Sequence, residues 1–420
     1  MTVESAPSID LLDRLRDYLG GDPAALVDPY PLFRDLREAG AVHDLGTTVV
    51  VSRYDAVKAV LLDASRLSSR TFVGSRVEEM QATMTGEERS AFDELVRFDS
   101  NSMQHTDGDR HGRLRRIVGR SFTPRRIELL RARVEDFTNE LIASLEVNGV
   151  ADLREFSYQL PLKVVVDLLD APQSMMPAIR GWSEAIGESR GITTGARVAA
   201  AARALTEFRA YVESLAAELR NDPRDGSLVG TLINAEAEEK LTTEELTTMF
   251  IVILFAGHET TTNLLSIGLL DLLRHPDQWQ RLCAAPAATA PSAVEELLRY
   301  SNPVQTINRV ALEDVEIADS RIPERRAVVG LLGAANRDPA VFENPDTLDV
   351  CRGDVPHLGL GHGPHFCLGS ALTRLEAQTA FVTLASRFPD MELAVAPDEL
   401  TWSGNAMLRK VEALPIALNA

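Results

Sequence analysis

Residues 357–369 read HLGLGHGPHFCLG and lead directly into a helical pattern over residues 370–388. Four glycines and one proline in this stretch impose a tight, unusual backbone. Cys367 stands where the loop opens the helix, and the backbone N–H groups at a helix N-terminus favour an anion. A thiolate at Cys367 would therefore be stabilised at this position.

Two explanations fit a cysteine in this loop. Zinc sites in proteins use four ligands, whereas haem iron accepts a single protein thiolate, so a lone Cys367 suits haem iron better than zinc. Taken by itself, however, the loop fits a buried structural cysteine better than a ligand. The choice between the two depends on the rest of the sequence.

A second stretch predicts one long central helix over about residues 243–274. Thr242, followed three residues later by Glu245, forms a capping-box start, and His275-Pro276 forms a stop. At 1.5 Å per residue the helix is roughly 45 Å long, enough to cross a domain. Its interior is apolar on most sides, which predicts burial.

The middle of this apolar helix carries a polar run, Gly257-His258-Glu259-Thr260-Thr261. Glycine costs about 1 kcal/mol in a helix interior, and a carboxylate in apolar surroundings needs a partner or a function. Threonine hydroxyls can bond back to a carbonyl one turn earlier and loosen the helix. The run therefore indicates either a functional site or a satisfied polar patch at a kink.

Helical patterns also dominate elsewhere, while strand patterns are few and short. No repeat and no low-complexity linker divides the chain, so we expect a single domain over residues 1–420, mainly α with small β-sheets. The helical segments are 32–39, 55–62, 113–122, 127–146, 196–219, 244–274, 292–300 and 370–388, and the strand segments are 48–52, 310–317 and 327–332.

Composition narrows the functional classes. The chain has 420 residues, of which 45% are hydrophobic and 25% charged, so it can bury a large core. Its formal charge of -19 argues against binding nucleic acid or an anionic membrane. Three cysteines fit a reducing compartment, and neither a signal peptide nor a membrane-spanning run is recognised. We therefore expect a cytoplasmic protein.

The motifs together resemble those of the cytochrome P450 family. Residues 357–369 are similar to its cysteine-ligand loop, residues 256–261 to its oxygen-activation motif, and Glu296-x-x-Arg299 to its Glu-x-x-Arg motif, in the same order. Residues 28–31 and 336–339 extend the resemblance over nearly the whole chain. The resemblance implies the single-domain cytochrome P450 fold, and it is strongest to the soluble bacterial members.

The resemblance assigns roles to the two chemical motifs. It implies that Cys367 is the axial thiolate ligand of the haem iron, and that its electron donation favours O–O cleavage. Glu259 and Thr260 would be the catalytic acid and alcohol that relay protons to O2 at the haem. Ala256 and Gly257 would also contact the haem, with Gly257 leaving room for O2.

The implied cofactor is haem b, iron protoporphyrin IX, whose two propionates require cationic or hydrogen-bonding partners in a protein interior. The family pattern places these partners at His111, Arg115, Arg309 and His365. His111 and Arg115 are four residues apart and would share one helix face. Gly369, two residues after the cysteine, would complete the haem-binding set.

An arginine-rich segment indicates an electron-donating partner. The segment from Arg110 to Arg126 contains no carboxylate, although the chain as a whole is strongly acidic. Asp109 immediately precedes the segment. The resemblance implies electrons from a ferredoxin and a ferredoxin reductase, and a basic patch would steer an acidic ferredoxin. A solvated helix face is the alternative for any single arginine. The arginines are Arg110, Arg113, Arg115, Arg116, Arg120, Arg125 and Arg126.

Glu296 and Arg299 are expected to form a buried structural ion pair. Thr347 stands where the family often has a basic residue that completes this network, and Arg352 is a candidate substitute. Leu360 stands where a phenylalanine is usual in the cysteine loop, which affects packing against the thiolate.

The resulting hypothesis is a haem-thiolate monooxygenase that uses O2 and two electrons to hydroxylate or epoxidise a small organic substrate. A secondary metabolite such as a polyketide, macrolide or terpenoid is the expected substrate. Oxidative coupling without oxygen insertion remains an alternative, as does a non-catalytic activator of a partner enzyme. A zinc protease is excluded, because residue 262 is threonine where the second histidine of its motif would stand.

Overall fold

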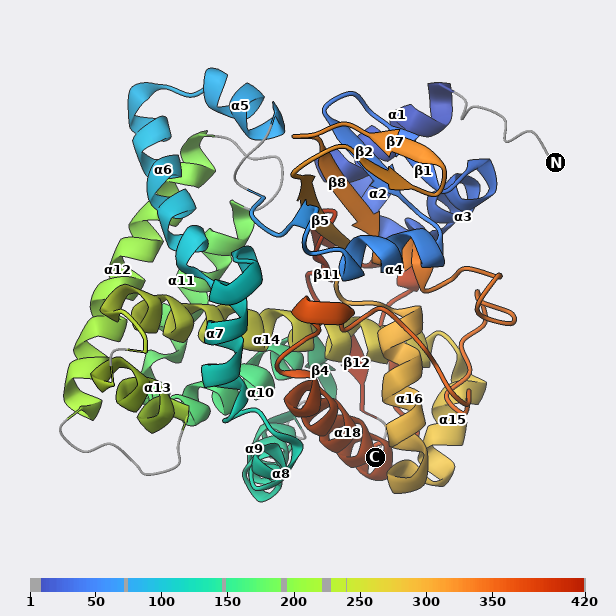
Figure 1. Ribbon diagram of the computed structural model, residues 1–420. Coiled ribbons are helices and arrows are strands. Elements are labelled where there is room, and N and C mark those ends of the chain that lie inside the picture. Colours follow the sequence, from blue (N-terminus) through green and yellow to red (C-terminus); the bar gives the residue numbers. More distant parts are fainter. Residues whose placement is uncertain are drawn as a thin grey trace.

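A helix of 31 residues, Thr243–Leu273 (α14), crosses the middle of the molecule in the computed structural model (Figure 1). Other helices surround it, and the strands form only small sheets, which confirms the predicted fold class. The structure describes residues 9–71, 75–145, 149–189, 195–220, 228–238 and 240–418.

Helices account for most of the described chain. The α-helices are α1 Ile9–Gly20, α2 Pro23–Val27, α3 Tyr30–Ala39, α4 Tyr54–Leu62, α5 Ser75–Ala82, α6 Gly86–Asn101, α7 Gly108–Gly119, α8 Pro124–Glu128, α9 Arg131–Leu145, α10 Leu153–Leu168, α11 Met176–Glu188, α12 Gly195–Leu219, α13 Leu228–Ala237, α14, α15 Pro276–Ala284, α16 Pro286–Tyr300, α17 Leu332–Ala335 and α18 Ser370–Arg387. The strands are β1 Val42–Asp44, β2 Thr48–Val51, β3 Leu67–Ser68, β4 Val150–Asp152, β5 Thr306–Ala311, β6 Val315–Ile317, β7 Ser320–Ile322, β8 Ala327–Leu331, β9 Glu392–Leu393, β10 Trp402–Gly404, β11 Arg409–Val411 and β12 Pro415–Ala417.

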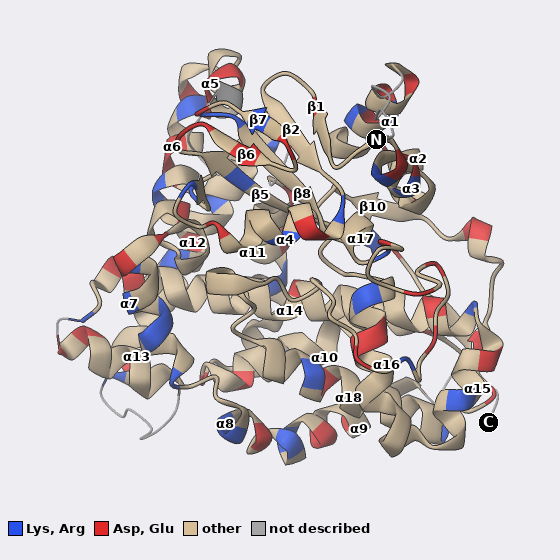
Figure 2. Cartoon of the chain, turned by 45° about the vertical axis from the view of Figure 1, so that its right-hand side comes forward, with Lys and Arg blue, Asp and Glu red and all other residues tan. Residues whose placement is uncertain are grey.

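The predicted start of α14 is confirmed. The Thr242 hydroxyl accepts from the Glu245 backbone N–H at 3.1 Å, and the Glu245 carboxylate accepts from the Thr242 N–H at 3.2 Å. Figure 2 shows the helix as largely uncharged, with most charged residues on outer elements. By length and composition α14 could cross a membrane, but 72% of its most apolar stretch is buried inside the protein. It is therefore explained as the core helix.

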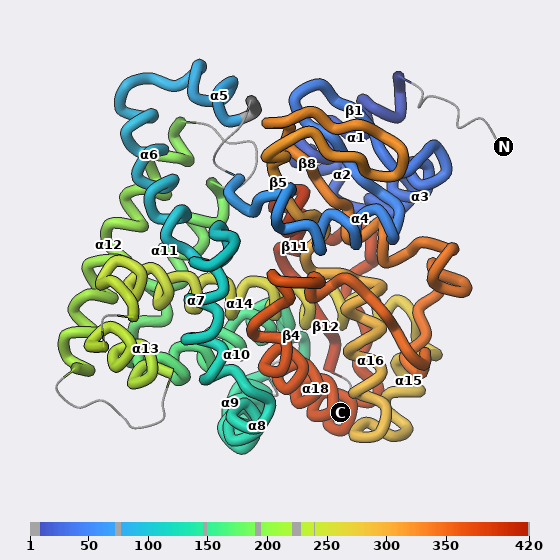
Figure 3. The backbone as a smooth tube through the Cα atoms, in the orientation of Figure 1, coloured from blue at the N-terminus to red at the C-terminus, as the bar shows by residue number. Residues whose placement is uncertain are grey.

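The largest sheet joins distant parts of the chain, with strand order β1-β2-β8-β5-β3 (Figure 3). Strand β2 pairs in parallel with β8, so Thr48 lies opposite Ala327. Alternate residues point to opposite faces. Val50 and Val329 pack in a cluster with residues of α1 and α3, whereas Val49 packs with residues of α4 on the other face.

Glu296 and Arg299 form the predicted ion pair on α16, and both side chains are fully buried. Arg299 donates to both carboxylate oxygens at 2.7 and 2.8 Å. Arg352 Nε lies 3.0 and 3.1 Å from the same two oxygens, so Arg352 does complete the network. Thr347 contributes its backbone carbonyl, which accepts from both arginines.

Residues 336–338 connect this network to three other parts of the molecule. The Asn336 side chain accepts from the Leu358 N–H at 2.7 Å, at the start of the cysteine loop. Arg337 lies over the rings of Tyr30 and Tyr300, 3.4 and 3.8 Å from their centroids.

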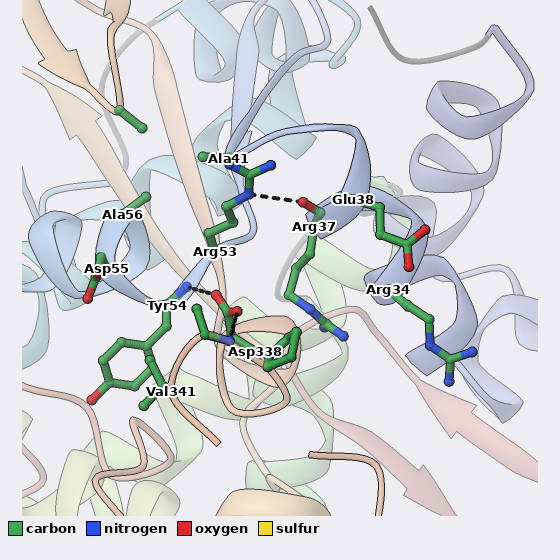
Figure 4. A pocket seen from close by; sticks show the side chains of 13 residues that line it. Arg34, Arg37, Glu38, Ala41, Arg53, Tyr54, Asp55, Ala56, Asp338 and Val341 are labelled. Carbon is green, nitrogen blue, oxygen red and sulfur yellow. Dashed lines mark hydrogen bonds between the residues drawn. The ribbon is translucent and has the colours of Figure 1, made fainter. Parts of the chain in front are cut away.

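Asp338 accepts from the Tyr54 N–H at 2.8 Å and so caps α4, beside a solvent-open hollow of about 430 Å³ (Figure 4).

The structure contains helices that were not predicted, and several predicted segments have other bounds. Residues 310–317 do not form one strand, because β5 ends at Ala311 and β6 begins only at Val315. Helix α10 was not predicted, and it contains Pro161 together with several β-branched residues that obscure a helical pattern. It nevertheless packs along α14 more extensively than any other described helix.

Breaking the buried ion pair should strongly destabilise the protein. In Glu296→Gln, Arg299 and Arg352 lose their shared carboxylate, so we expect the free energy of unfolding to fall by about 3 to 5 kcal/mol. Urea unfolding measures this change. The control is Asp35→Asn, which removes an exposed partner of Arg14 and should cost less than about 1 kcal/mol. Equal effects of the two substitutions would contradict the structural role.

Candidate active site

The cysteine loop lies between α16 and α4, and its glycines allow that close packing. A Cβ at Gly359 would overlap the carbonyl oxygen of Leu298. Gly361 and Gly363 have φ angles of 73° and 71°, in the left-handed region that glycine tolerates. The loop closes through a hydrogen bond of 2.8 Å from the Cys367 N–H to the Leu360 carbonyl.

Cys367 lies just before α18, as predicted, but burial dominates its electrostatics. Burial raises the pKa of the thiol, and the smaller effects of the Gly369 N–H, Arg115 and Arg374 lower it. The expected stabilisation of the thiolate by the helix N-terminus is therefore present but outweighed. A bound cation at the sulfur would reverse this balance, because a coordinating thiol is deprotonated.

A cluster of cationic side chains gathers beside the loop. The rings of His111 and His365 lie 4.2 Å apart, and His365 Nε2 is 3.4 Å from a carboxylate oxygen of Asp107. Burial, followed by the nearby His365 and Arg115, lowers the pKa of His111 to about 4. Within the described residues, the buried His111 Nε2 and Arg309 Nε have no hydrogen-bond partner.

This cluster brings together all four predicted propionate partners. Unpartnered buried donors are costly, so a ligand with acceptor oxygens would stabilise the Arg309 Nε–H, and also His111 in the tautomer that carries a proton on Nε2. Two carboxylate groups on a ligand would supply these acceptor oxygens, whereas the single carboxylate of Asp107 does not accept from either nitrogen. Asp107 was missed by sequence reasoning because it gives no local signal, and its contacts with Ser68 and Ser69 are long-range.

The polar run of α14 shows the expected back-bonding. The Thr260 hydroxyl donates to the Ala256 carbonyl at 3.1 Å. Burial raises the pKa of Glu259, but contact with His258 and the positive charges of Arg154 and Lys410 outweigh it, so the net shift is downward. Glu259 also lines a solvent-connected cavity of about 330 Å³ between α14, α11 and the β10–β11 hairpin.

Gly257 has a packing role that the sequence did not indicate. A Cβ at this position would lie 3.0 Å from Cγ2 of Val165 on α10. Glycine therefore allows the two helices to approach closely. Its expected role in leaving room for O2 stays a prediction.

Comparisons with known proteins agree with this arrangement. A family model described as Cytochrome P450 matches residues 196–285 and 290–405. The chain is 36% identical to the cytochrome P450 monooxygenase PikC of Streptomyces venezuelae, covering 99% of this chain and 95% of that protein. It is also 36% identical to the 6-deoxyerythronolide B hydroxylase of Saccharopolyspora erythraea, over 94% and 96% of the two chains. The chain belongs to the cytochrome P450 family.

Solved structures of other P450s have the same fold. The tirandamycin C-bound P450 monooxygenase TamI superimposes with a TM-score of 0.82 at 34% identity, covering 95% of this chain and 99% of that one. CxnD, a P450 enzyme for C–S bond formation in chuangxinmycin biosynthesis, gives a TM-score of 0.83 at 33% identity, over 93% and 94%. This cytochrome P450 is an oxidoreductase, as its relatives are.

The family implies a haem cofactor, and the residues present fit one. Among the described residues, no group of three or more His, Cys, Asp or Glu side chains could hold a metal ion by itself. The unpartnered donors of His111 and Arg309 fit the acidic edge of a haem.

The arginine-rich segment divides into two parts in this P450. Arg110 and Arg113 bind Glu245 at the start of α14, so they hold α7 in place. Arg115 donates to the Phe366 carbonyl in the cysteine loop at 2.6 Å. Arg110, Arg113 and Arg115 are thus engaged in contacts within the protein. The arginines with exposed side chains are Arg116, Arg120, Arg125 and Arg126.

Glu376 on α18 is a buried carboxyl that sequence reasoning did not single out. It is 1% exposed, and burial raises its pKa to about 8, against a smaller opposing effect of Thr261 on α14. The sequence offered one indication of it, because Glu376 is a carboxylate within a helical segment with many apolar residues. The P450 therefore carries acidic residues both on α14 and on the neighbouring helix.

Glu376 should make stability fall as pH rises. Its pKa is raised from 4.5 to about 8 on folding, so the folded state holds a proton that the unfolded state loses across this range. Between pH 5.5 and 7.5, wild type should lose about 2 to 3 kcal/mol of unfolding free energy relative to Glu376→Gln. Urea unfolding at both pH values measures this, with the exposed Glu399→Gln as control. Parallel pH dependence in Glu376→Gln and wild type would contradict the assignment.

Proposed function

We propose that this P450 inserts one oxygen atom of O2 into a small organic substrate by hydroxylation or epoxidation. The supporting observation is that a half-buried thiol, Cys367, occurs together with the acid Glu259 and the alcohol Thr260 on the buried helix α14. A secondary metabolite such as a polyketide, macrolide or terpenoid is the proposed substrate. The relatives of this P450 include PikC and PksS, and PksS of Bacillus subtilis is named for polyketide biosynthesis.

The proposed cofactor is haem b, which when bound supplies the activation of O2 with two electrons. Cys367 would hold the iron through Sγ, and Gly369 would donate its N–H to the same sulfur. His111, Arg115, Arg309 and His365 would hold the propionates. Their convergence in one cluster beside the loop supports these assignments.

Glu259 and Thr260 are proposed to deliver protons. Glu259 lines the solvent-connected cavity, so its carboxylate can exchange protons with water. Thr260 is the next residue along α14. The Thr260 hydroxyl donates to the Ala256 carbonyl, which leaves its oxygen free to accept a hydrogen bond from a neighbouring donor. The two residues thus form a path from water to the face of α14 that Ala256 and Thr260 share.

Oxidative coupling without oxygen insertion is a second candidate. It is favoured by the similarity to CxnD, which is named for C–S bond formation. Turnover under ¹⁸O2 distinguishes the two reactions, because a monooxygenase product gains one labelled atom and a coupling product gains none. A non-catalytic activator role is disfavoured, since Cys367, Glu259 and Thr260 are all retained.

The proposed location is the cytoplasm, and the proposed electron donors are a ferredoxin and its reductase. The net charge of -19 disfavours nucleic acid and anionic membranes as partners. An acidic ferredoxin needs a local basic surface instead. The exposed Arg116, Arg120, Arg125 and Arg126 on and beside α7 and α8 supply one.

The first test is the absorption spectrum after dithionite reduction under carbon monoxide. Wild type should show a strongly red-shifted Soret band, because thiolate is the axial ligand. Cys367→Ala should lose this band, and the exposed Cys351→Ala should keep it. A spectrum typical of histidine ligation in wild type would overturn the proposed function.

A second test addresses the ferredoxin surface. Arg120→Glu should raise the ferredoxin concentration for half-maximal reduction roughly fivefold at low salt, and the difference should shrink at high salt. Arg89→Glu, an exposed arginine on α6, is the matched charge reversal away from the patch. Equal responses of the two variants would exclude docking at Arg120.

A further inference from the structure

His258 is a buried histidine, and one of its two ring nitrogens is hydrogen-bonded to the backbone. The side chain is fully buried on α14, and its Nδ1 lies 2.6 Å from the Leu254 carbonyl. A carbonyl oxygen only accepts hydrogen bonds, so Nδ1 must carry a proton. Nε2 is therefore the only atom of His258 that can gain or lose a proton.

Nε2 faces two groups that can exchange a proton with it. The Tyr158 hydroxyl on α10 is 3.3 Å away, and a carboxylate oxygen of Glu259 is 3.6 Å away. Burial, followed by the negative charge of Glu259, raises the pKa of Tyr158, so its hydroxyl stays protonated and can donate to a neutral Nε2. When Nε2 carries a proton, it can donate to Glu259 instead.

The surrounding charges make Glu259 alone a poor proton store at neutral pH. Burial raises the pKa of Glu259, but the contact with His258, followed by the positive charges of Arg154 and Lys410, lowers it by more, so its ionised form is favoured. Arg180 lies 4.2 Å from the centre of the Tyr158 ring and is paired with Glu155 and Glu184. The charged and titratable groups around His258 are thus Tyr158, Glu259, Arg154 and Arg180, with the two carboxylates that neutralise Arg180.

We propose that His258 stores the proton that Glu259 delivers, so that it acts through Glu259 and is not itself a catalytic residue. The proton moves from Nε2 to a carboxylate oxygen of Glu259, which leaves a neutral imidazole held by Tyr158. Water in the cavity then returns a proton through Glu259 to Nε2. This inference rests on the proposed monooxygenase function.

The test measures coupling, the product formed per NADPH consumed, as a function of pH. His258→Asn keeps a donor for the Leu254 carbonyl but lacks the second nitrogen. We expect at least about a threefold loss of coupling at pH 8, with release of hydrogen peroxide, and a much smaller loss at pH 6, where protons are more available. His258→Gln should behave like His258→Asn, because an amide cannot store a proton.

Tyr158→Phe should have the opposite effect. It removes the hydrogen-bond donor of the neutral imidazole and leaves the contact of Nε2 with Glu259, so coupling at pH 8 should be at least that of wild type. The matched control is Tyr211→Phe, which removes a tyrosine hydroxyl on α12 that is unpartnered within the described residues. It should leave the coupling profile unchanged.

Two further measurements separate proton storage from a structural role. Turnover driven by hydrogen peroxide, which needs no delivered protons, should be unchanged in both His258 variants. Nitrogen-15 NMR of the reduced carbon monoxide form, with His258→Asn to assign the signal, should show a proton on Nε2 as well as on Nδ1 of His258 at pH 6, which the contact with Leu254 alone does not require. These readouts do not depend on O2-driven activity.

Three results would overturn the proposal. They are full coupling in His258→Gln, equal losses at pH 6 and pH 8, or a parallel loss of peroxide-driven turnover. Failure of the monooxygenase function itself is recognised separately, because the wild-type carbon monoxide spectrum would then lack the red-shifted band. With that band present, any of the three results counts against His258 alone.

Discussion

The buried carboxylate of Glu296 is the interaction on which the site depends. It neutralises Arg299 and Arg352, and Arg299 also donates to the Asn336 and Pro345 carbonyls. The Asn336 side chain in turn holds the start of the cysteine loop. The position of Cys367 is thus set by ionic contacts far from the sulfur, because a fully buried pair tolerates little displacement without losing its hydrogen bonds.

The electrostatics of the active site are arranged for a cofactor with a positive centre and negative edges. Burial opposes charge on the Cys367 sulfur, so the thiolate form needs a metal ion beside it. Beside the cysteine loop, the buried His111 Nε2 and Arg309 Nε have no hydrogen-bond partner within the described residues. Haem satisfies both requirements at once, since its iron is cationic and its propionates are anionic.

Local motifs predicted the central features, and long-range contacts supplied the rest. The capping box at Thr242 and the thiol loop at Cys367 follow from residues close in sequence. The packing of Gly257 on Val165 could not be predicted, because it joins two helices about 90 residues apart. Likewise, nothing near Arg113 in the sequence reveals that Glu245 binds it. Substrate identity is also absent from these motifs, which serve the chemistry common to the family.

The parallel pairing of β2 with β8 has a consequence for folding during synthesis. Residues 48–51 cannot complete their sheet until residues 327–330 have left the ribosome, about 275 residues later. At about 5 to 20 residues per second this delay lasts roughly 15 to 55 seconds. During that time β2 can pair with β1, which lies beside it in the sequence, but not with β8.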